Sequence, residues 1–302
     1  MYKNFFGLRV APFSVSPDPR FLCMTESVRQ ALASLSYGIY NRKGILLLTG
    51  EVGTGKTTVI NKLMEWLHQV HFSTAFIFNP NLSVTDFMDV MLSDFGIRCG
   101  SREKGQRLIQ LNGWLLQRHT GGHSAVVIVD EAQGLSTELL EELRLFTNLE
   151  TFTQKLLQVV LCGQPELETK LREPQLRQLR QRIVVRCNMK PLTAHEVQTY
   201  VAQRLQRAGA NGTPIFTSET IDAIAHYSCG IPRVINLLCE HALIGAFADQ
   251  QRPVSTTTIN AVAKEFELDT SGPSCWQDED RFFNDSSRAV TLGRKAPASE
   301  VG

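Results

Sequence analysis

A glycine-rich loop between an apolar run and a helical pattern constrains the fold of this 302-residue chain more than any other feature. The apolar run covers residues 45–48, the loop reads GEVGTGKT over residues 50–57, and the helical pattern continues to about residue 70. A loop of this composition between a buried strand and a helix matches the P-loop pattern in the context that the pattern requires. The sequence therefore predicts an α/β fold with a triphosphate site after its first strand.

Each part of this loop has a task in binding a phosphate chain. Glycines let main-chain N–H groups wrap the phosphates, and the N-terminus of the helix adds positive potential. We expect Lys56 to reach the β- and γ-phosphates and the Thr57 hydroxyl to coordinate Mg²⁺. The flanking strand and helix disfavour the alternative, a chance glycine-rich turn. The predicted ATP-binding residues of the loop are Gly50, Glu51, Val52, Gly53, Thr54, Gly55, Lys56, Thr57 and Thr58.

An apolar run that ends in two carboxylates supplies the second half of the predicted site. Residues 125–129 read AVVIV and are followed by Asp130 and Glu131. Carboxylates at the end of a buried strand are costly unless they face a cation or solvent. We expect Asp130 to hold Mg²⁺ through water and Glu131 to orient and deprotonate the attacking water. Together with the P-loop, the pair predicts a magnesium-dependent ATPase; two surface acids at the start of a loop are the alternative.

Apolar runs and helical patterns alternate as far as residue 189. The predicted strands are residues 45–48, 75–78, 125–129, 156–162 and 183–186. Uninterrupted apolar runs that alternate with helices indicate a parallel sheet covered by helices on both faces. We therefore predict an ATPase domain over residues 1–189, in which an irregular segment rich in Phe and Pro precedes the first strand.

The strand pattern stops after this domain. Thr193 and Glu196 form a capping box that opens a helix to about residue 208. Three more helices fit residues 218–227, 232–249 and 255–267. We predict an all-helical lid domain over residues 190–268 and a disordered tail over residues 269–302, where Ser, Gly, Pro and charged residues show little pattern.

Composition narrows the class of protein. The chain is 43% hydrophobic and 20% charged, as is usual for a globular protein, and its formal net charge is +1. That small charge argues against a nucleic-acid binder that depends on bulk electrostatics, although it leaves room for a local basic face. No apolar run reaches the ~18 residues that span a bilayer, and the start lacks the apolar core of a secretory signal peptide. We therefore expect a cytoplasmic protein.

Longer motifs extend beyond the predicted site. They are PDPRFL at residues 17–22, LTGEVGTGKTT at residues 48–58, DEAQ at residues 130–133, GQPEL at residues 163–167, QLRQRI at residues 178–183 and GIPRVIN at residues 230–236. With these motifs the chain resembles the AAA+ ATPases, and within them the general secretion pathway protein A (ExeA-like) family. The resemblance implies a RecA-like sheet domain and a helical lid with nucleotide between them. It also implies an ATP-dependent homo-oligomer, a ring or filament, in which an arginine of one subunit enters the site of the next.

The resemblance further implies roles for single residues. Arg233 is similar to the lid arginine (sensor 2) that contacts the γ-phosphate. Arg182 is similar to the arginine finger, with Arg180 as the next choice because both lie just before the last strand. Gln164 occupies the sensor 1 position, where many AAA+ proteins have Asn or Thr.

Two further features have competing interpretations. Asn79 ends the second predicted strand, where some AAA+ proteins keep a polar residue that restrains the catalytic glutamate; a turn residue is the alternative. The aromatic segment around Phe13 and Phe21 is expected to cover the adenine, to pack against the sheet, or to do both.

Three functions fit this pattern. The resemblance favours an assembly or motor ATPase of an export or envelope system with a membrane-associated partner. The alternative is a DNA-binding regulator of transposition that recruits a transposase, with phosphate contacts from the arginines of residues 172–186. Against it, Leu171, Leu176, Leu179 and Ile183 interleave those arginines at helical spacing, as in an amphipathic subunit contact. A scaffold switched by nucleotide is the third, and Glu131 disfavours it.

Overall fold

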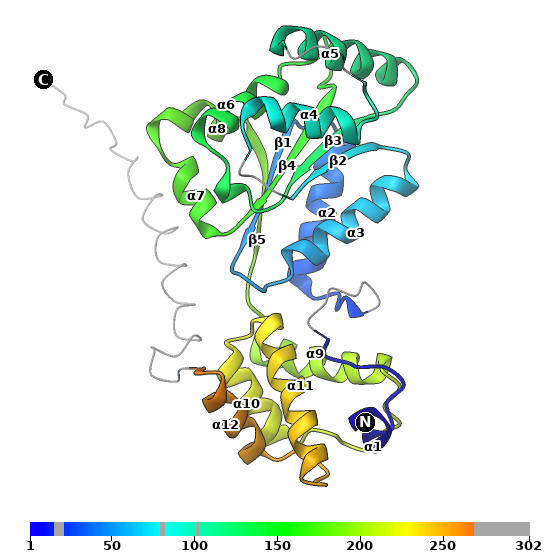
Figure 1. The fold of residues 1–302 in the computed structure, drawn as a ribbon, viewed down its shortest axis with the longest axis vertical. Helices are drawn as coiled ribbons and strands as arrows, with labels where there is room; N and C mark the ends of the chain where they lie inside the picture. Colours follow the sequence, from blue (N-terminus) through cyan, green and yellow to red (C-terminus); the bar gives the residue numbers. More distant parts are fainter. Residues whose placement is uncertain (15–20, 79–81, 99, 101–102, 269–302) are drawn as a thin grey trace, which may run out of the picture.

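The computed structural model describes residues 1–14, 21–78, 82–98, 100 and 103–268. A parallel sheet with helices on both faces lies next to a separate group of helices (Figure 1). The predicted tail and Asn79 lie outside the described residues. Within the described part of the chain, no helix is long and apolar enough to span a membrane.

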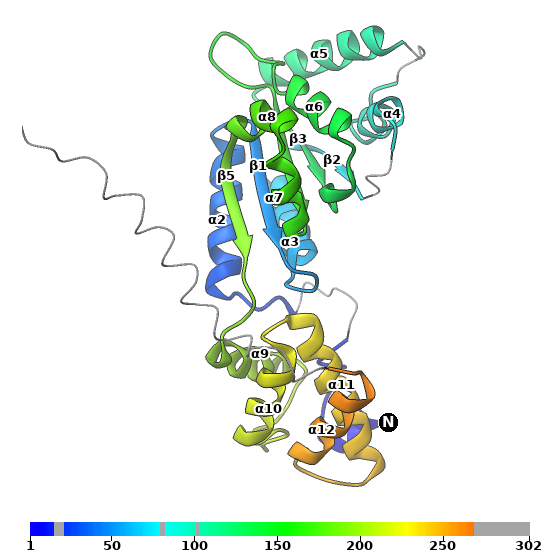
Figure 2. The ribbon, with the colours of Figure 1, turned by 90° about the vertical axis from the view of Figure 1, so that its left-hand side faces the viewer.

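Five parallel strands form the sheet in the order β2-β3-β4-β1-β5. They are β1 (Ile45–Gly50), β2 (Ser73–Ile77), β3 (Ala125–Val129), β4 (Leu157–Gly163) and β5 (Ile183–Met189). Because all strands are parallel, their carboxyl ends meet at one edge, which faces the helical domain (Figure 2). The loops after β1, β3 and β4 therefore lie together.

The predicted fifth strand, residues 183–186, is shorter than the observed β5. This strand lies at the edge of the sheet, and its residues alternate between buried or half-buried and exposed. β5 therefore lacks the uninterrupted apolar pattern of a central strand beyond its first residues. Its backbone pairing with β1 nevertheless continues to Met189.

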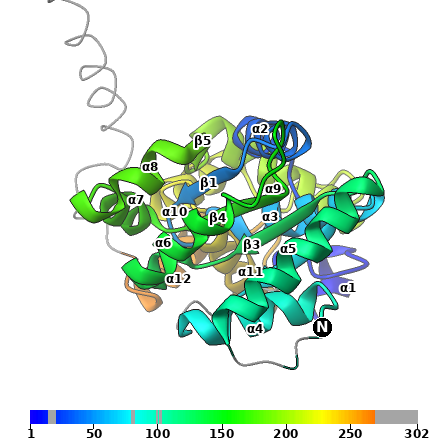
Figure 3. The same cartoon turned by 90° about the horizontal axis from the view of Figure 1, so that it is seen from above.

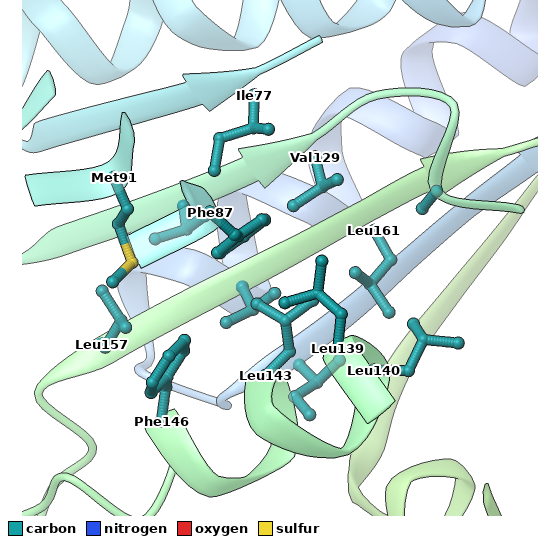
Figure 4. Packing of buried hydrophobic residues seen from close by; sticks show 14 of the residues in the cluster. Ile77, Phe87, Met91, Val129, Leu139, Leu140, Leu143, Phe146, Leu157 and Leu161 are labelled. Atoms are coloured by element: carbon teal, nitrogen blue, oxygen red, sulfur yellow. The ribbon is translucent and has the colours of Figure 1, made fainter. Parts of the chain in front are cut away.

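One face of the sheet is covered by helices that pack apolar side chains on the strands. Leu139, Leu143 and Phe146 share one buried cluster with Val129 and Leu157 of the strands (Figure 4). The helices are α4 (Val84–Asp94), α5 (Lys104–Thr120), α6 (Thr137–Phe146), α7 (Pro165–Leu171) and α8 (Arg177–Arg182). Each contributes buried residues to a single cluster with the sheet.

The leucines between the arginines of residues 172–186 belong to the same core. Leu171, Leu176, Leu179 and Ile183 are buried against the sheet of their own chain. The interpretation of their spacing as an amphipathic subunit contact is therefore wrong: the apolar stripe is used within the fold, and the arginines remain on its outer side.

Two helices cover the opposite face of the sheet (Figure 3). They are α2 (Glu26–Tyr40) and α3 (Lys56–Gln69), whose buried residues pack on β1, β3 and β4. Both faces of the sheet are thus covered, as predicted for a parallel sheet.

The second group of helices forms a core of its own. It contains α9 (Ala194–Arg207), α10 (Ser218–Ser228), α11 (Pro232–Ala248) and α12 (Thr256–Glu265). The predicted capping box opens α9: the Thr193 hydroxyl accepts the N–H of Glu196, whose carboxylate accepts the N–H of Thr193. These helices agree closely with the predicted positions.

The phenylalanines of the N-terminal segment pack in the core of these helices and not against the sheet. Phe6, Phe13 and Phe21 are buried among residues of α9 to α12, and Arg204 Nε donates to the Pro12 carbonyl at 2.6 Å. The expectation of sheet packing is therefore wrong. The segment also contains a short regular element, α1 (Tyr2–Phe6), that the irregular pattern did not predict.

Candidate nucleotide-binding site

The glycine-rich loop connects β1 to α3 in a tight turn. Gly53 and Gly55 have φ angles of 83° and 100°, which residues with side chains rarely adopt. The Thr54 hydroxyl donates to the Glu51 carbonyl at 2.8 Å and holds the turn closed. Gly55 occupies the N-cap of α3 without a side-chain cap, so the first N–H groups of the helix are left for a ligand.

Lys56 lies at the centre of this turn. Its side chain is almost fully buried, and its Nζ donates to the carbonyls of Gly50 and Glu51 at 2.7 and 3.0 Å. A buried ammonium needs such acceptors. Because the lysine is held within the loop, phosphate oxygens that enter the turn meet a fixed positive charge.

Thr57 and Asp130 bring a hydroxyl and a carboxylate together. Thr57 Oγ1 donates to Asp130 Oδ2 at 3.2 Å, although the two residues come from α3 and from the end of β3. Oxygen ligands of this kind suit Mg²⁺, which prefers few carboxylates with water and phosphate oxygens. The donor set therefore fits the metal that the sequence predicts.

Glu131 begins the turn after β3 in a left-handed conformation, with φ of 53°. Its Oε2 accepts hydrogen bonds from Gln133 Nε2 at 2.5 Å and from Gln164 Nε2 at 3.1 Å. The N–H of Gln164 in turn donates to Gln133 Oε1 at 3.1 Å. The structure thus brings Gln164 to the candidate base and adds Gln133, to which the sequence gave no individual role.

These neighbours also favour the ionised form of Glu131. The hydrogen bond from Gln133 is the largest cause that lowers the pKa of Glu131; the bond from Gln164 and the charge of Lys56 add to it, against the opposing effect of burial. Donors stabilise the ionised form of a carboxyl group. Glu131 is therefore a carboxylate at neutral pH.

Arg233 reaches the loop from the helical domain. The main-chain N–H of Arg233 donates to the Gly53 carbonyl at 3.2 Å. A Cβ on residue 53 would lie only 2.7 Å from the Arg233 Cβ. A glycine is needed at this position both for its φ angle and for the close approach of α11. The helical domain is therefore in direct contact with the loop.

A cavity of 260 Å³ lies between the two domains. The glycine-rich loop, Glu131 and Arg233 line it, together with Phe21, Tyr200 and Asn236. Tyr200 and Asn236 were missed because they look like ordinary helix residues: nothing in a helical pattern tells which polar side chain faces a neighbouring domain. Phe13 is fully buried and is not among the lining residues.

Comparisons with known proteins agree with this geometry. The family model of an AAA domain matches residues 39–171. General secretion pathway protein A of Aeromonas hydrophila is 46% identical over 267 residues, which are 88% of this chain and 48% of that protein. The chain contains an AAA domain and has the AAA+ fold. The resemblance to general secretion pathway protein A that the sequence predicts is confirmed.

More distant relatives share parts of this AAA+ chain. ATP-dependent target DNA activator B of Escherichia phage Mu is 29% identical over 129 residues, which are 43% of this chain and 39% of that protein. The structure of the Aeropyrum pernix ORC2 protein has a TM-score of 0.62 and 17% identity over 84% of this chain and 71% of that chain. That likeness confirms the fold. The AAA+ chain spans about half the length of general secretion pathway protein A.

Arg182 is not brought to the cavity of its own AAA+ chain. It ends α8 just before β5 and so lies at the amino edge of the sheet, whereas the cavity lies at the carboxyl edge. Its Nη1 donates to Asn148 Oδ1, and to Thr147 Oγ1 at 3.4 Å. Any contact of Arg182 with nucleotide therefore requires a second copy of the chain.

Proposed function

We propose that this AAA+ protein binds MgATP at residues 50–58 and hydrolyses it to ADP and phosphate, with Glu131 as the general base. The observation that carries the proposal is the meeting of three groups at one edge of the sheet: the buried Lys56 in its glycine turn, the Thr57–Asp130 pair at 3.2 Å, and Glu131 lining the same cavity as the turn.

Each of these residues has a defined task. Main-chain N–H groups of the turn and Lys56 bind the β- and γ-phosphates, while Thr57 and Asp130 hold Mg²⁺ directly and through water. When bound, Mg²⁺ neutralises charge on the phosphate oxygens. Glu131 accepts a proton from the water that attacks the γ-phosphate, and Arg233 binds the γ-phosphate from the lid.

The same cavity is suited to the adenine. Phe21 and Tyr200 line it with aromatic side chains, and the Arg204 guanidinium lies 5.0 and 5.3 Å from their ring centroids. Asn236 offers an amide whose Oδ1 already accepts the Tyr200 hydroxyl at 3.0 Å. A pocket that combines aromatic side chains with a few fixed polar groups suits a planar nucleotide base. The part of the aromatic segment that covers the adenine is therefore Phe21.

A nucleotide-binding and turnover assay on the full chain tests the proposal. The wild-type protein is expected to hydrolyse ATP only with Mg²⁺. Lys56→Ala should weaken ATP affinity about 100-fold, since a hydrogen bond to a charged group contributes roughly 1.5–3 kcal/mol. Lys62→Ala, an exposed lysine of the same helix, is the matched control and should bind normally. Undiminished affinity in Lys56→Ala would refute the phosphate assignment.

The biological role that we propose is an assembly or motor ATPase of an export or envelope system. The support is the 46% identity to general secretion pathway protein A. In this role the protein forms an ATP-dependent homo-oligomer, a ring or filament, in the cytoplasm and acts through a membrane-associated partner. Arg182 of one subunit completes the site of the next.

DNA binding is the second candidate function, and one observation favours it. Because the leucines of residues 171–183 are buried, Arg172, Arg177 and Arg186 are left exposed on the outside of α7, α8 and β5. The relative from phage Mu is, by its description, a target DNA activator. ATP-dependent retention on duplex DNA that weakens steeply with salt would favour this function; retention that ignores ATP and salt would count against it.

A further inference from the structure

We infer that Gln133 is a positioning residue for hydrolysis: it fixes the Glu131 carboxylate so that one oxygen is left for the attacking water. This inference rests on the proposed function of Glu131. The starting observation is that both side-chain amides near Glu131, those of Gln133 and Gln164, donate to the same oxygen, Oε2. Neither of them occupies Oε1, which is the oxygen that remains to accept a proton.

The orientation of the Gln133 amide follows from its other contact. Gln133 Oε1 accepts the main-chain N–H of Gln164 at 3.1 Å, and a main-chain N–H can only donate. The atom that faces Gln164 N must therefore be the oxygen, and the atom that faces Glu131 must be the NH₂ group. Gln133 thus links the turn after β3 to the end of β4 and cannot reverse without losing both contacts.

Two features of the surroundings hold Gln133 in this place. A Cβ on residue 163 would lie 2.8 Å from Gln133 Oε1, so only glycine at the end of β4 leaves room for the amide. Lys170 of α7 donates to the carbonyls of Gln133 and Leu135 and fixes the main chain of the turn. Gln133 is half-buried, and its side chain is engaged at both ends.

Hydrolysis is faster with a positioned base than with an unpositioned one, because the carboxylate must face the water in the reactive geometry. A misplacement of ~1 Å can lower a rate about 100-fold. Loss of the Gln133 amide leaves Glu131 with the longer bond from Gln164 as its only contact of this kind among the described side chains. The carboxylate then samples other rotamers, while the phosphate contacts of Lys56 are unaffected.

Gln133→Met tests the inference because methionine keeps the length of the side chain and removes both amide contacts. We expect kcat to fall roughly 10- to 100-fold, with ATP affinity within about threefold of wild type. In a Glu131→Gln background the same substitution should change kcat no further, because the group that Gln133 positions is already gone. A further fall in that background, or an unchanged kcat in the single variant, would overturn the inference.

Control variants separate positioning from folding. Gln117→Met, at an exposed glutamine of α5, should leave kcat unchanged. Gln133→Asn keeps the amide but is one methylene too short to join Glu131 to Gln164, so it should lose activity like Gln133→Met; wild-type turnover in this variant would contradict the inference.

A crystal structure of the Gln133→Met protein decides the matter without turnover. A Glu131 carboxylate displaced from Gln164 would support the inference, and one in its present position would overturn it. If the wild-type protein failed to hydrolyse ATP, the proposed function would be refuted, whereas the structure would still report whether Gln133 positions Glu131.

Discussion

The two edges of the sheet use charged side chains in opposite ways. At the carboxyl edge, Lys56, Asp130 and Glu131 converge near one cavity, with hydrogen bonds that leave some of their atoms open to a ligand. At the amino edge, charged side chains pair with neighbours on adjoining loops: Arg182 with Asn148, and Lys155 with Glu150.

This difference between the two edges follows from the common direction of the five strands. Side chains that follow the strands are brought together because all carboxyl ends meet at one edge, next to the helical domain. Side chains that precede the strands do not reach that cavity, so the proposed role of Arg182 in nucleotide chemistry requires another copy. The cavity lies at the carboxyl edge, and the contacts between chains that we propose for Arg182 would lie at the amino edge.

Glu131→Gln gives the largest expected effect and tests the carboxyl edge. The amide keeps the shape of the side chain but cannot accept a proton from water, so turnover should fall about 10⁴-fold. ATP affinity should be retained, because Lys56 and the glycine turn are unchanged. Single-turnover hydrolysis and equilibrium binding measure the two quantities separately. Wild-type turnover would remove Glu131 from the role of base.

Arg182→Ala tests the amino edge, with an expected loss of about 10³-fold in turnover and unchanged ATP binding. Mixing it with Lys56→Ala should restore part of the activity, because an intact Arg182 from one variant can then enter the intact nucleotide site of the other. Arg180→Ala is the comparison variant. Normal ATP turnover in Arg182→Ala, with no recovery on mixing, would show that the amino edge has no part in catalysis.

Lys170→Met gives the smallest expected effect. It compares, within the carboxyl edge, a residue that contacts Glu131 with one that acts only through the main chain of the turn. Lys170 acts one step away from the base, through the carbonyls of Gln133 and Leu135. Its loss removes charge-assisted hydrogen bonds, each contributing roughly 1.5–3 kcal/mol, so thermal unfolding should shift down by several degrees. Turnover should fall only about threefold, well below the effect at Gln133. If turnover fell further in Lys170→Met than in Gln133→Met, the main constraint on the turn after β3 would come from α7.

Local motifs were enough to predict much of the carboxyl edge. The glycine turn and the acids after β3 each lie on a few consecutive residues, and the parallel sheet brings them together. A contact between Gln133 and Glu131 could have been predicted, since the two residues are only two positions apart. The role of Gln133 also depends on a contact with Gln164, which is distant in the sequence and could not be predicted from it. The lining residues Tyr200 and Asn236 needed the packing of one domain on another, which helical periodicity does not encode.

The N-terminal segment was the main error of prediction for the same reason. Its phenylalanines showed that it packs over something, but a broken aromatic pattern does not identify the surface. The surface is the core of helices that begin about 180 residues later in the chain. Apolar residues without periodicity are free to join any core that has a gap of the right size.

This packing has a consequence for synthesis on the ribosome. Phe6, Phe13 and Phe21 are made before the sheet domain, yet the core that buries them is completed only by α11 and α12 near the end of the described chain. The sheet domain is translated in between, while these aromatic side chains remain exposed and prone to aggregation. These side chains therefore lack their native core until α11 and α12 have been made, and deleting residues 1–23 would leave the helical domain with an open apolar surface.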